Sequence, residues 1–382
     1  MRRFLVLLLI AGLFISACMS TPTPTAVPTK PPPTAAPTAV PTVAPTLVQP
    51  TQAPSATVMV LPTATKVPPT ATPGKQIKKI GFSTDVGRID DKSFNQASWE
   101  GVQLVGKELG AEVKYVVTVD AKDYLKNIQQ FADAGYDVIV TSGFAYGPAT
   151  IEAAKKWPNI TFIGTDQFQA ETLSNLAGLI FDEDKAGFLA GALAALMSKS
   201  NIIGAVLGTD VVPPVVKFGK GYENGAKYIN PNIRVLMAYH PGGLAKGFTD
   251  PDWGASTAKA MIDQKADVIF GAGGDTGNGA LLYCAKPEVN VMAIGVDVDQ
   301  YNTVPGAQKV LLSSAMKLLA PGVVNIIKTV AAGKFKGGNI VGPVGLAPFH
   351  DWDTKVPQTV KDKLKQIDAN LQNGSLKTGV SL

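Results

Sequence analysis

Residues 77–142 read IKKIGFSTDVGRIDDKSFNQASWEGVQLVGKELGAEVKYVVTVDAKDYLKNIQQFADAGYDVIVTS. Short runs rich in β-branched residues, none with an internal proline, recur at residues 77–83, 113–119 and 137–142. Helical patterns lie between these runs, at residues 93–109 and 122–134, and each run has the length expected of a strand. Strands that alternate with helices form a parallel sheet covered on both faces. This stretch therefore predicts an α/β fold.

The alternation continues and then begins again further along the chain. A helix at residues 148–156 and a strand at 160–165 extend the first unit. A second unit is predicted from strands at 202–207, 233–239, 268–270 and 291–296, with helices near 215–229 and 255–264. Two similar units in succession predict two lobes, each a doubly wound parallel sheet. No strong sequence repeat links the units, so their similarity is architectural.

The first 74 residues differ from the rest in composition. Residues 21–74 contain 15 of the 28 prolines together with 14 threonines and almost no charge, so they cannot bury enough apolar surface to offset the entropy of ordering. We expect a semi-rigid, extended stalk over residues 18–74. Its composition would also allow O-glycosylation.

The segment before the stalk has the features of a processing signal. Two arginines precede a 14-residue apolar run that ends at Cys18, and this run is too short to span a bilayer as a helix. We therefore expect a signal peptide at residues 1–17. The end of the run resembles the bacterial lipoprotein box, in which the cysteine becomes the new N-terminus and carries the lipid; the alternative is an ordinary signal peptide with an incidental Cys18.

Composition excludes several classes of protein. The formal net charge of +5 falls to +3 without Arg2 and Arg3, so no nucleic-acid footprint is expected. Only Cys18 and Cys284 are present, which excludes a disulfide scaffold. With two histidines, neither in a metal-ligand spacing, and no GxSxG motif, neither an enzyme, a metal site nor a cofactor is expected.

Polar and aromatic residues follow the predicted strands. Ligands of open α/β sheets bind beyond the carboxyl ends of the strands, and these turns hold Asp85, Phe144, Asp166, the glycine-rich turn around Gly273, and Asp297. An aspartate at such a position can instead cap the following helix. The alternative is weaker for all the aspartates together than for any one of them.

Six motifs of the chain resemble one known family. They are GFSTDVG (81–87), DDKSFNQASWEG (90–101), KFGKGYENGAKYINP (217–231), GAGGDTGNG (271–279), GVDVDQ (295–300) and SSAMK (313–317). In this order they resemble the basic membrane protein family, whose studied members are purine-nucleoside-binding lipoproteins of ABC importers. The resemblance spans nearly all of the chain after the stalk.

The resemblance implies a type I periplasmic-binding-protein fold, in which two lobes joined by crossing strands close over a ligand like a hinge. We expect a first lobe of residues 75–180 plus 297–336. The second lobe would comprise residues 181–296 plus 337–382. The glycine-rich turn at 271–279 lacks the Lys-Ser or Lys-Thr pair of a phosphate-binding loop, so we interpret it as a turn into the helix that contains Cys284.

The resemblance also implies roles for individual residues. Phe94 and Phe218 would sandwich the purine from opposite lobes, and Asn95 and Asp166 would bind its polar edge. Asp297 and Lys317 would hold the ribose hydroxyls. The remaining residues implied to line the cleft are Asp85, Phe144 and Gly273.

Each of the main assignments has an alternative. Phe94 and Phe218 could be core residues, and Lys317 could be a solvated lysine at a strand end. The expected function is that of a lipid-anchored extracytoplasmic binding protein, monomeric, that delivers guanosine, inosine or adenosine to an ABC permease. A stalked surface lipoprotein, a receptor for a sugar or signalling molecule, and a nucleoside hydrolase remain alternatives.

Overall fold

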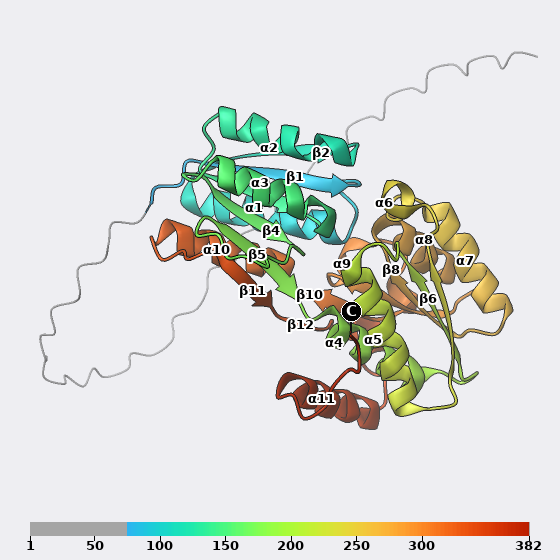
Figure 1. Ribbon diagram of the computed structural model, residues 1–382. Helices are drawn as coiled ribbons and strands as arrows, with labels where there is room; N and C mark the ends of the chain where they lie inside the picture. The colour runs from blue at the N-terminus through green and yellow to red at the C-terminus, as the bar shows by residue number, and fades with distance from the viewer. Residues whose placement is uncertain (1–74, 382) are drawn as a thin grey trace, which may run out of the picture. The chain divides into compact units, whose positions relative to one another are not determined.

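A computed structural model describes residues 75–381. The expected signal peptide, Cys18 and the stalk lie outside the described residues. Figure 1 shows two α/β lobes built from segments that alternate along the chain.

The first lobe is a parallel sheet between two helical layers. Its strand order is β11 (Gly338–Gly342), β5 (Leu176–Phe181), β4 (Thr161–Thr165), β3 (Val138–Ser142), β1 (Lys79–Val86) and β2 (Glu112–Thr118). One apolar layer contains α1 (Phe94–Leu109) and α10 (Leu319–Ala331), and the other contains α2 (Tyr124–Asp133) and α3 (Gly147–Lys156). The central strands β3 and β4 are buried along their whole length, as expected of a parallel sheet covered on both faces.

The second lobe has the same architecture. Its strand order is β12 (Val344–Leu346), β10 (Leu311–Lys317), β9 (Met292–Asp297), β8 (Val268–Ala272), β6 (Ile202–Leu207) and β7 (Arg234–Tyr239), with β12 antiparallel to β10. Its helices are α4 (Glu183–Met197), α5 (Pro213–Ile229), α6 (Gly243–Lys246), α7 (Pro251–Asp263), α8 (Gly274–Cys284), α9 (Gln300–Thr303) and α11 (Gln358–Gln372). Comparing the two strand orders, β1, β3 and β4 of the first sheet correspond to β6, β8 and β9 of the second.

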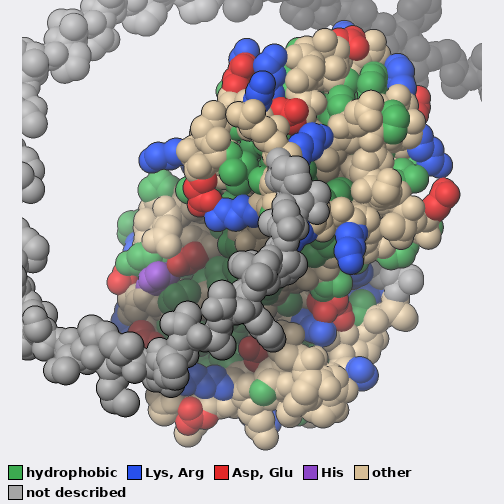
Figure 2. All heavy atoms as spheres, turned by 90° about the vertical axis from the view of Figure 1, so that its left-hand side faces the viewer, with side chains coloured by type: hydrophobic (Ala, Val, Ile, Leu, Met, Phe, Trp, Pro, Cys, Tyr) green, Lys and Arg blue, Asp and Glu red, His purple; other side chains and the backbone are tan. Residues whose placement is uncertain are grey.

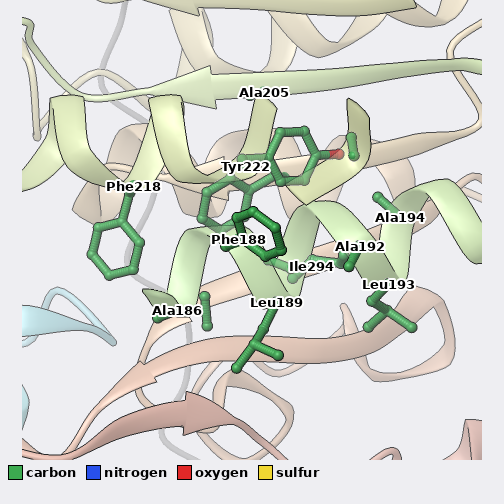
Figure 3. Close-up of a cluster of buried hydrophobic side chains, with 14 of the residues drawn as sticks. Ala186, Phe188, Leu189, Ala192, Leu193, Ala194, Ala205, Phe218, Tyr222 and Ile294 are labelled. Carbon is green, nitrogen blue, oxygen red and sulfur yellow. The ribbon is translucent and has the colours of Figure 1, made fainter. Parts of the chain in front are cut away.

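Helices α4 and α5 pack closely over the second sheet (Figure 3). Glycines make this possible: a Cβ atom on Gly191 would lie 1.9 Å from the carbonyl oxygen of Tyr222, and one on Gly225 would lie 1.9 Å from that of Phe188. Tyr222 is stacked on Phe270 of β8 with ring centroids 5.0 Å apart. The glycines thus bring α5 and its Phe218 close to α4.

The chain crosses between the lobes at three places. It passes from β5 to α4, from β10 to α10, and from β11 to β12. The expected lobe boundaries were therefore wrong for two segments. Residues 297–317, assigned to the first lobe, belong to the second, because they contain the end of β9, α9 and the strand β10 that pairs with β9. Residues 338–342, assigned to the second lobe, pair with β5 in the first.

The predicted strands and main helices are confirmed, with small shifts at their ends. The α/β class with two parallel-sheet lobes is confirmed. Cys284 is fully buried in α8, as expected of a small apolar side chain.

Candidate functional site

A cavity lies where the carboxyl ends of strands from both lobes meet. All nine side chains or backbone positions that the sequence singled out line this one cavity: Asp85, Phe94, Asn95, Phe144, Asp166, Phe218, Gly273, Asp297 and Lys317. The structure therefore brings together residues that are up to 232 positions apart, from Asp85 to Lys317.

Two aspartates occupy corresponding positions in the two lobes. Asp166 directly follows β4 and Asp297 ends β9, the third strand of each sheet in spatial order. Both adopt left-handed backbone conformations, with φ of 59° and 65°, which is uncommon for any residue other than glycine. Strain of this kind concentrates at ligand-binding sites. Neither aspartate acts as the N-cap of the next helix, so the capping alternative is wrong for this pair.

Lys317 lies at the centre of the charged groups. Its ammonium nitrogen is 2.5 Å from Oδ2 of Asp166, 3.7 Å from Oδ1 of Asp297 and 3.9 Å from Oε1 of Glu183. Burial alone would lower the pKa of Lys317, but these carboxylates raise it above its ordinary value. The side chain is 2% exposed. Lys317 is therefore a buried, charged lysine, and the alternative of a solvated lysine is wrong.

The oxygens of Asp166 differ in their contacts. Oδ2 accepts a hydrogen bond from Lys317, whereas Oδ1 is buried and has no hydrogen-bond partner among the described residues. Burial raises the pKa of Asp166 above its ordinary value, although Lys317 opposes this shift. A buried oxygen of this kind is a ready acceptor for a ligand donor.

Aromatic rings from both lobes surround the same ammonium group. The nitrogen of Lys317 lies 4.6 Å from the ring centroid of Phe94 and 5.5 Å from that of Phe218. Phe94 opens α1, the helix after β1, and Phe218 lies in α5, the helix after the corresponding strand β6. Phe94 is partly buried and Phe218 is 3% exposed, and each also packs against its lobe's apolar core.

Asn95 and its neighbour Asp91 are held by the start of α1. The Asp91 carboxylate accepts hydrogen bonds from the backbone N–H groups of Ser93, Asn95 and Gln96, at 2.9–3.1 Å. Oδ1 of Asn95 accepts a hydrogen bond from the Ser142 hydroxyl at the end of β3. Burial raises the pKa of Asp91 to about 7.

Asp85 lines another part of the cavity. Its carboxylate accepts hydrogen bonds from the Tyr124 hydroxyl and from the backbone N–H of Val86, and burial raises its pKa to about 6. Gly143, with φ of 99°, lies so close that a Cβ atom there would be 2.1 Å from Oδ2 of Asp85. Phe144, which follows this glycine, is 40% exposed.

Gly273 allows two turns of the second lobe to approach each other. A Cβ atom on Gly273 would lie 2.6 Å from the backbone nitrogen of Gly208, so a larger residue would separate the turns. This turn leads into α8, as the sequence predicted.

Sequence reasoning missed several residues around the cavity. Asp91 belongs to the quoted DDKSFN motif, and its spacing before α1 could have indicated a helix cap. Apolar residues that line the cavity carried no such signal: Val86, Val212, Pro214, Val215, Phe248 and Val296. Glu183 and Lys217 do not line it, but Lys217 donates to Glu183 at 3.1 Å and so supports the charged cluster.

A family model described as "ABC transporter substrate-binding protein PnrA-like" matches residues 77–343. The chain belongs to this Bmp family. The match covers both lobes as far as β11. The protein is therefore a substrate-binding protein of an ABC transporter, and the family is one of binding proteins, not of enzymes.

Several relatives resemble the chain over most of its length. An ABC transporter nucleoside-binding protein, BmpA, of Lactococcus lactis is 33% identical over 281 residues, covering 69% of this chain and 78% of that protein. A CD4+ T-cell-stimulating antigen of Listeria monocytogenes is 29% identical over 320 residues, covering 78% of this chain and 87% of that protein. A lipoprotein of Pyrococcus abyssi is 31% identical over 285 residues, covering 71% of this chain and 68% of that protein.

Solved structures of solute-binding proteins share the fold of this Bmp family chain. The ABC transporter system solute-binding protein of Aeropyrum pernix has a TM-score of 0.71 at 23% identity, covering 78% of this chain and 92% of that one. The expected type I periplasmic-binding-protein fold is therefore confirmed.

Two further features are absent from the described part of this Bmp family protein. Within residues 75–381 no helix is long and apolar enough to cross a membrane, and no cluster of His, Cys, Asp and Glu could hold a metal ion. On the face drawn in Figure 2, basic and acidic side chains are interspersed.

Proposed function

We propose that the protein captures a purine nucleoside between its lobes and delivers it to an ABC permease. The observation that carries this proposal is the pairing of Phe94 and Phe218, from corresponding helices of the two lobes, around a buried cluster of Asp166, Asp297 and Lys317. A nucleoside has a flat base that favours aromatic stacking and a sugar that favours charged hydrogen-bond partners. The site offers both.

The polar groups suit the two halves of such a ligand. Asn95 and the unpartnered Oδ1 of Asp166 would bind the polar edge of the base. Asp297 and Lys317 would bind the ribose hydroxyls. Phe144 and Asp85 would contact the ligand from the first lobe, and the turn at Gly273 from the second.

The name of one relative supports the proposal. The Lactococcus lactis relative is named as a nucleoside-binding protein.

Thermal unfolding with a panel of ligands tests the proposal. Guanosine, inosine and adenosine should raise the unfolding temperature, because a ligand that binds only the folded state stabilises it by mass action. Free bases, sugars and amino acids should raise it little. Stabilisation by a sugar and not by nucleosides would contradict the proposal, and release of free base from inosine at catalytic rates would make the protein a hydrolase.

A matched pair of variants tests the stacking. Phe94→Ala should weaken guanosine binding roughly ten- to a hundredfold in calorimetry, since aromatic stacking is worth about 1–3 kcal/mol per base. Phe168→Ala is the control, because Phe168 is also a phenylalanine of the first lobe but is 65% exposed and does not line the cavity. Equal affinity in the two variants would mean that Phe94 serves only the core.

The proposed location and partners follow from the family and the N-terminal sequence. A lipid on Cys18 would hold the protein on the extracytoplasmic face of the membrane, and the stalk of residues 18–74 would separate the lobes from it. The protein would act as a monomer and meet the permease as its macromolecular partner.

A further inference from the structure

The loop between β1 and α1, residues 87–93, is bound by side chains of the opposite lobe. Asn278 Nδ2 donates a hydrogen bond to the Asp91 carbonyl oxygen at 2.8 Å. Thr303 Oγ1 donates to the Lys92 carbonyl oxygen at 2.8 Å, and Gln300 Nε2 donates to the same oxygen at 3.3 Å. Three second-lobe donors therefore converge on two consecutive carbonyl groups of the first lobe.

This loop carries part of the cavity wall. Asp91 lines the cavity, and its carboxylate holds the first turn of α1, where Phe94 and Asn95 lie. Lys92 has a left-handed backbone, with φ of 59°, a conformation that costs free energy for a residue other than glycine and needs support from its surroundings. The three donors supply that support only when the lobes are together.

Two of the three donors, Asn278 and Gln300, are held by hydrogen bonds within their own lobe. Gln300 is 1% exposed, its Oε1 accepts a hydrogen bond from the Val296 N–H, and its Nε2 also donates to Oδ1 of Asn278 at 2.8 Å. Gln300 and Thr303 lie in α9, which begins three residues after Asp297. Little side-chain entropy is lost when donors of this kind meet the loop.

A further contact joins the same loop to the cavity itself. Ser93 Oγ donates to Oδ2 of Asp297 at 2.6 Å. Arg88 also lies 3.7 Å from Asp275 across the lobes, but Arg88 is largely exposed, so this ion pair contributes little. The buried and part-buried hydrogen bonds carry the connection.

We propose that Asn278, Gln300 and Thr303 are positioning residues for solute binding. None of them lines the cavity; they act by fixing the 87–93 loop, and with it Phe94 and Asn95, once the lobes meet. Breaking this connection should release bound solute faster without changing which solute is preferred. The inference needs a substrate-binding protein that closes, and it does not depend on the solute being a nucleoside.

Thr303→Val tests the connection, because it removes one hydroxyl donor and keeps the shape of the side chain. In stopped-flow measurements, guanosine should dissociate from this variant about three- to tenfold faster than from the wild type, because one hydrogen bond is lost. The ratio of guanosine to guanine affinity should not change. Thr303→Ser keeps the hydroxyl and should restore the wild-type rate.

Asn302→Ala is the matched control on the same helix. Among the described side-chain contacts, Asn302 donates only to Asp299, which lies in the same lobe. Guanosine should therefore dissociate from this variant at the wild-type rate. Equal dissociation rates in Thr303→Val and the wild type, or equal acceleration in Asn302→Ala, would overturn the inference.

Hydrogen exchange without any solute provides a second measurement, since each transient meeting of the lobes should already protect the loop. Backbone amides of residues 87–96 should exchange faster in Thr303→Val than in the wild type or Asn302→Ala, while those of α11 should be unchanged. If guanosine fails to bind the wild-type protein, the nucleoside proposal fails and this measurement alone decides the inference. Unchanged exchange at residues 87–96 would then overturn it.

Discussion

Asp297 shows how one side chain can serve both a ligand and the closure of the lobes. Its Oδ2 accepts a hydrogen bond from Ser93 of the first lobe, and its Oδ1 faces Lys317. The left-handed backbone that orients it recurs at Asp166, the corresponding position of the other sheet. Two strained aspartates at equivalent places indicate a site that uses both lobes in the same way.

If Asp297 accepts hydrogen bonds from ribose hydroxyls, Asp297→Asn should weaken the binding of nucleosides far more than the binding of their free bases. An amide keeps the size of the carboxylate but loses its charge-assisted hydrogen bonds, which are worth about 1.5–3 kcal/mol. Calorimetry with guanosine and guanine should show roughly ten- to a hundredfold weaker guanosine binding and little change for guanine.

Asp263→Asn is the control for this prediction, because Asp263 forms an exposed ion pair with Lys259 and is remote from the cavity. Equal losses for guanosine and guanine in Asp297→Asn would mean that Asp297 only maintains the closed arrangement, and the ribose would have to bind elsewhere.

The sequence predicted these residues because short-range signals marked them. Asp85, Asp166 and Asp297 each follow a recognisable β-branched run, and the family motifs supplied Phe94, Phe218 and Lys317. The support behind them was not predicted. Glu183 and Lys217 are 34 positions apart and meet only because α4 and α5 pack together.

At the scale of elements, the contact between α4 and α5 depends on backbone proximity. Gly187 and Gly191 of α4 lie against carbonyl oxygens of α5, while Gly221 and Gly225 of α5 lie against carbonyl oxygens of α4. This pairing positions Phe218 at the cavity and Lys217 beside Glu183. The helix packing therefore contributes directly to the geometry of the site.

Gly191→Ala should destabilise the protein, against the usual trend. In a helix interior alanine is normally more stable than glycine by about 1 kcal/mol. Here the new Cβ atom would lie 1.9 Å from the Tyr222 carbonyl oxygen, and overpacking of this kind costs about 1–3 kcal/mol. Urea denaturation should show a lower free energy of unfolding.

Gly147→Ala is the matched control, since Gly147 begins α3 and a Cβ atom there would meet only a side-chain atom of Gln167 at 3.9 Å. It should leave the free energy of unfolding unchanged or slightly higher. A stable Gly191→Ala variant would show that α4 and α5 can separate without cost.

The sequence reasoning left several elements unpredicted, among them the amphipathic helices α10 and α11. Helix α4 is buried on almost every side, so its apolar residues form no single stripe. The strands β5, β10 and β11 were not predicted, and the chain passes from one lobe to the other after each of them. Assignment of β10 and β11 to the correct lobe depends on long-range pairing, which local patterns do not encode.

For the whole molecule, the anchor and the lobes should be separable. Cys18→Ser should abolish incorporation of labelled fatty acid and release or mislocalise the protein. Guanosine affinity of the lobes should be unchanged, because the expected stalk lies between them and the anchor. Unchanged fatty-acid incorporation in this variant would contradict the lipoprotein assignment, and an otherwise equivalent surface change, Ser375→Ala, should leave incorporation intact.

The buried acidic groups should make the stability of the unliganded protein depend on pH. Burial raises the pKa of Asp85 to about 6, and of Asp91 and Glu183 to about 7, whereas carboxyl groups of an unfolded chain titrate near pH 4. Between these values the folded state binds more protons than the unfolded state. The stability that these groups contribute is therefore complete below about pH 4 and is lost as the pH rises through 6 and 7.

Glu183→Gln tests this account, because it keeps the shape of a side chain that is 1% exposed and removes its titration. Urea denaturation at several pH values should give a free energy of unfolding that falls less steeply between pH 5 and 7.5 than in the wild type, with the remaining slope due to Asp85 and Asp91. Glu288→Gln, at an exposed position, should retain the full wild-type slope. Identical slopes in Glu183→Gln and the wild type would mean that Glu183 stays ionised throughout this range, with Lys217 and Lys317 fully offsetting the cost of its burial.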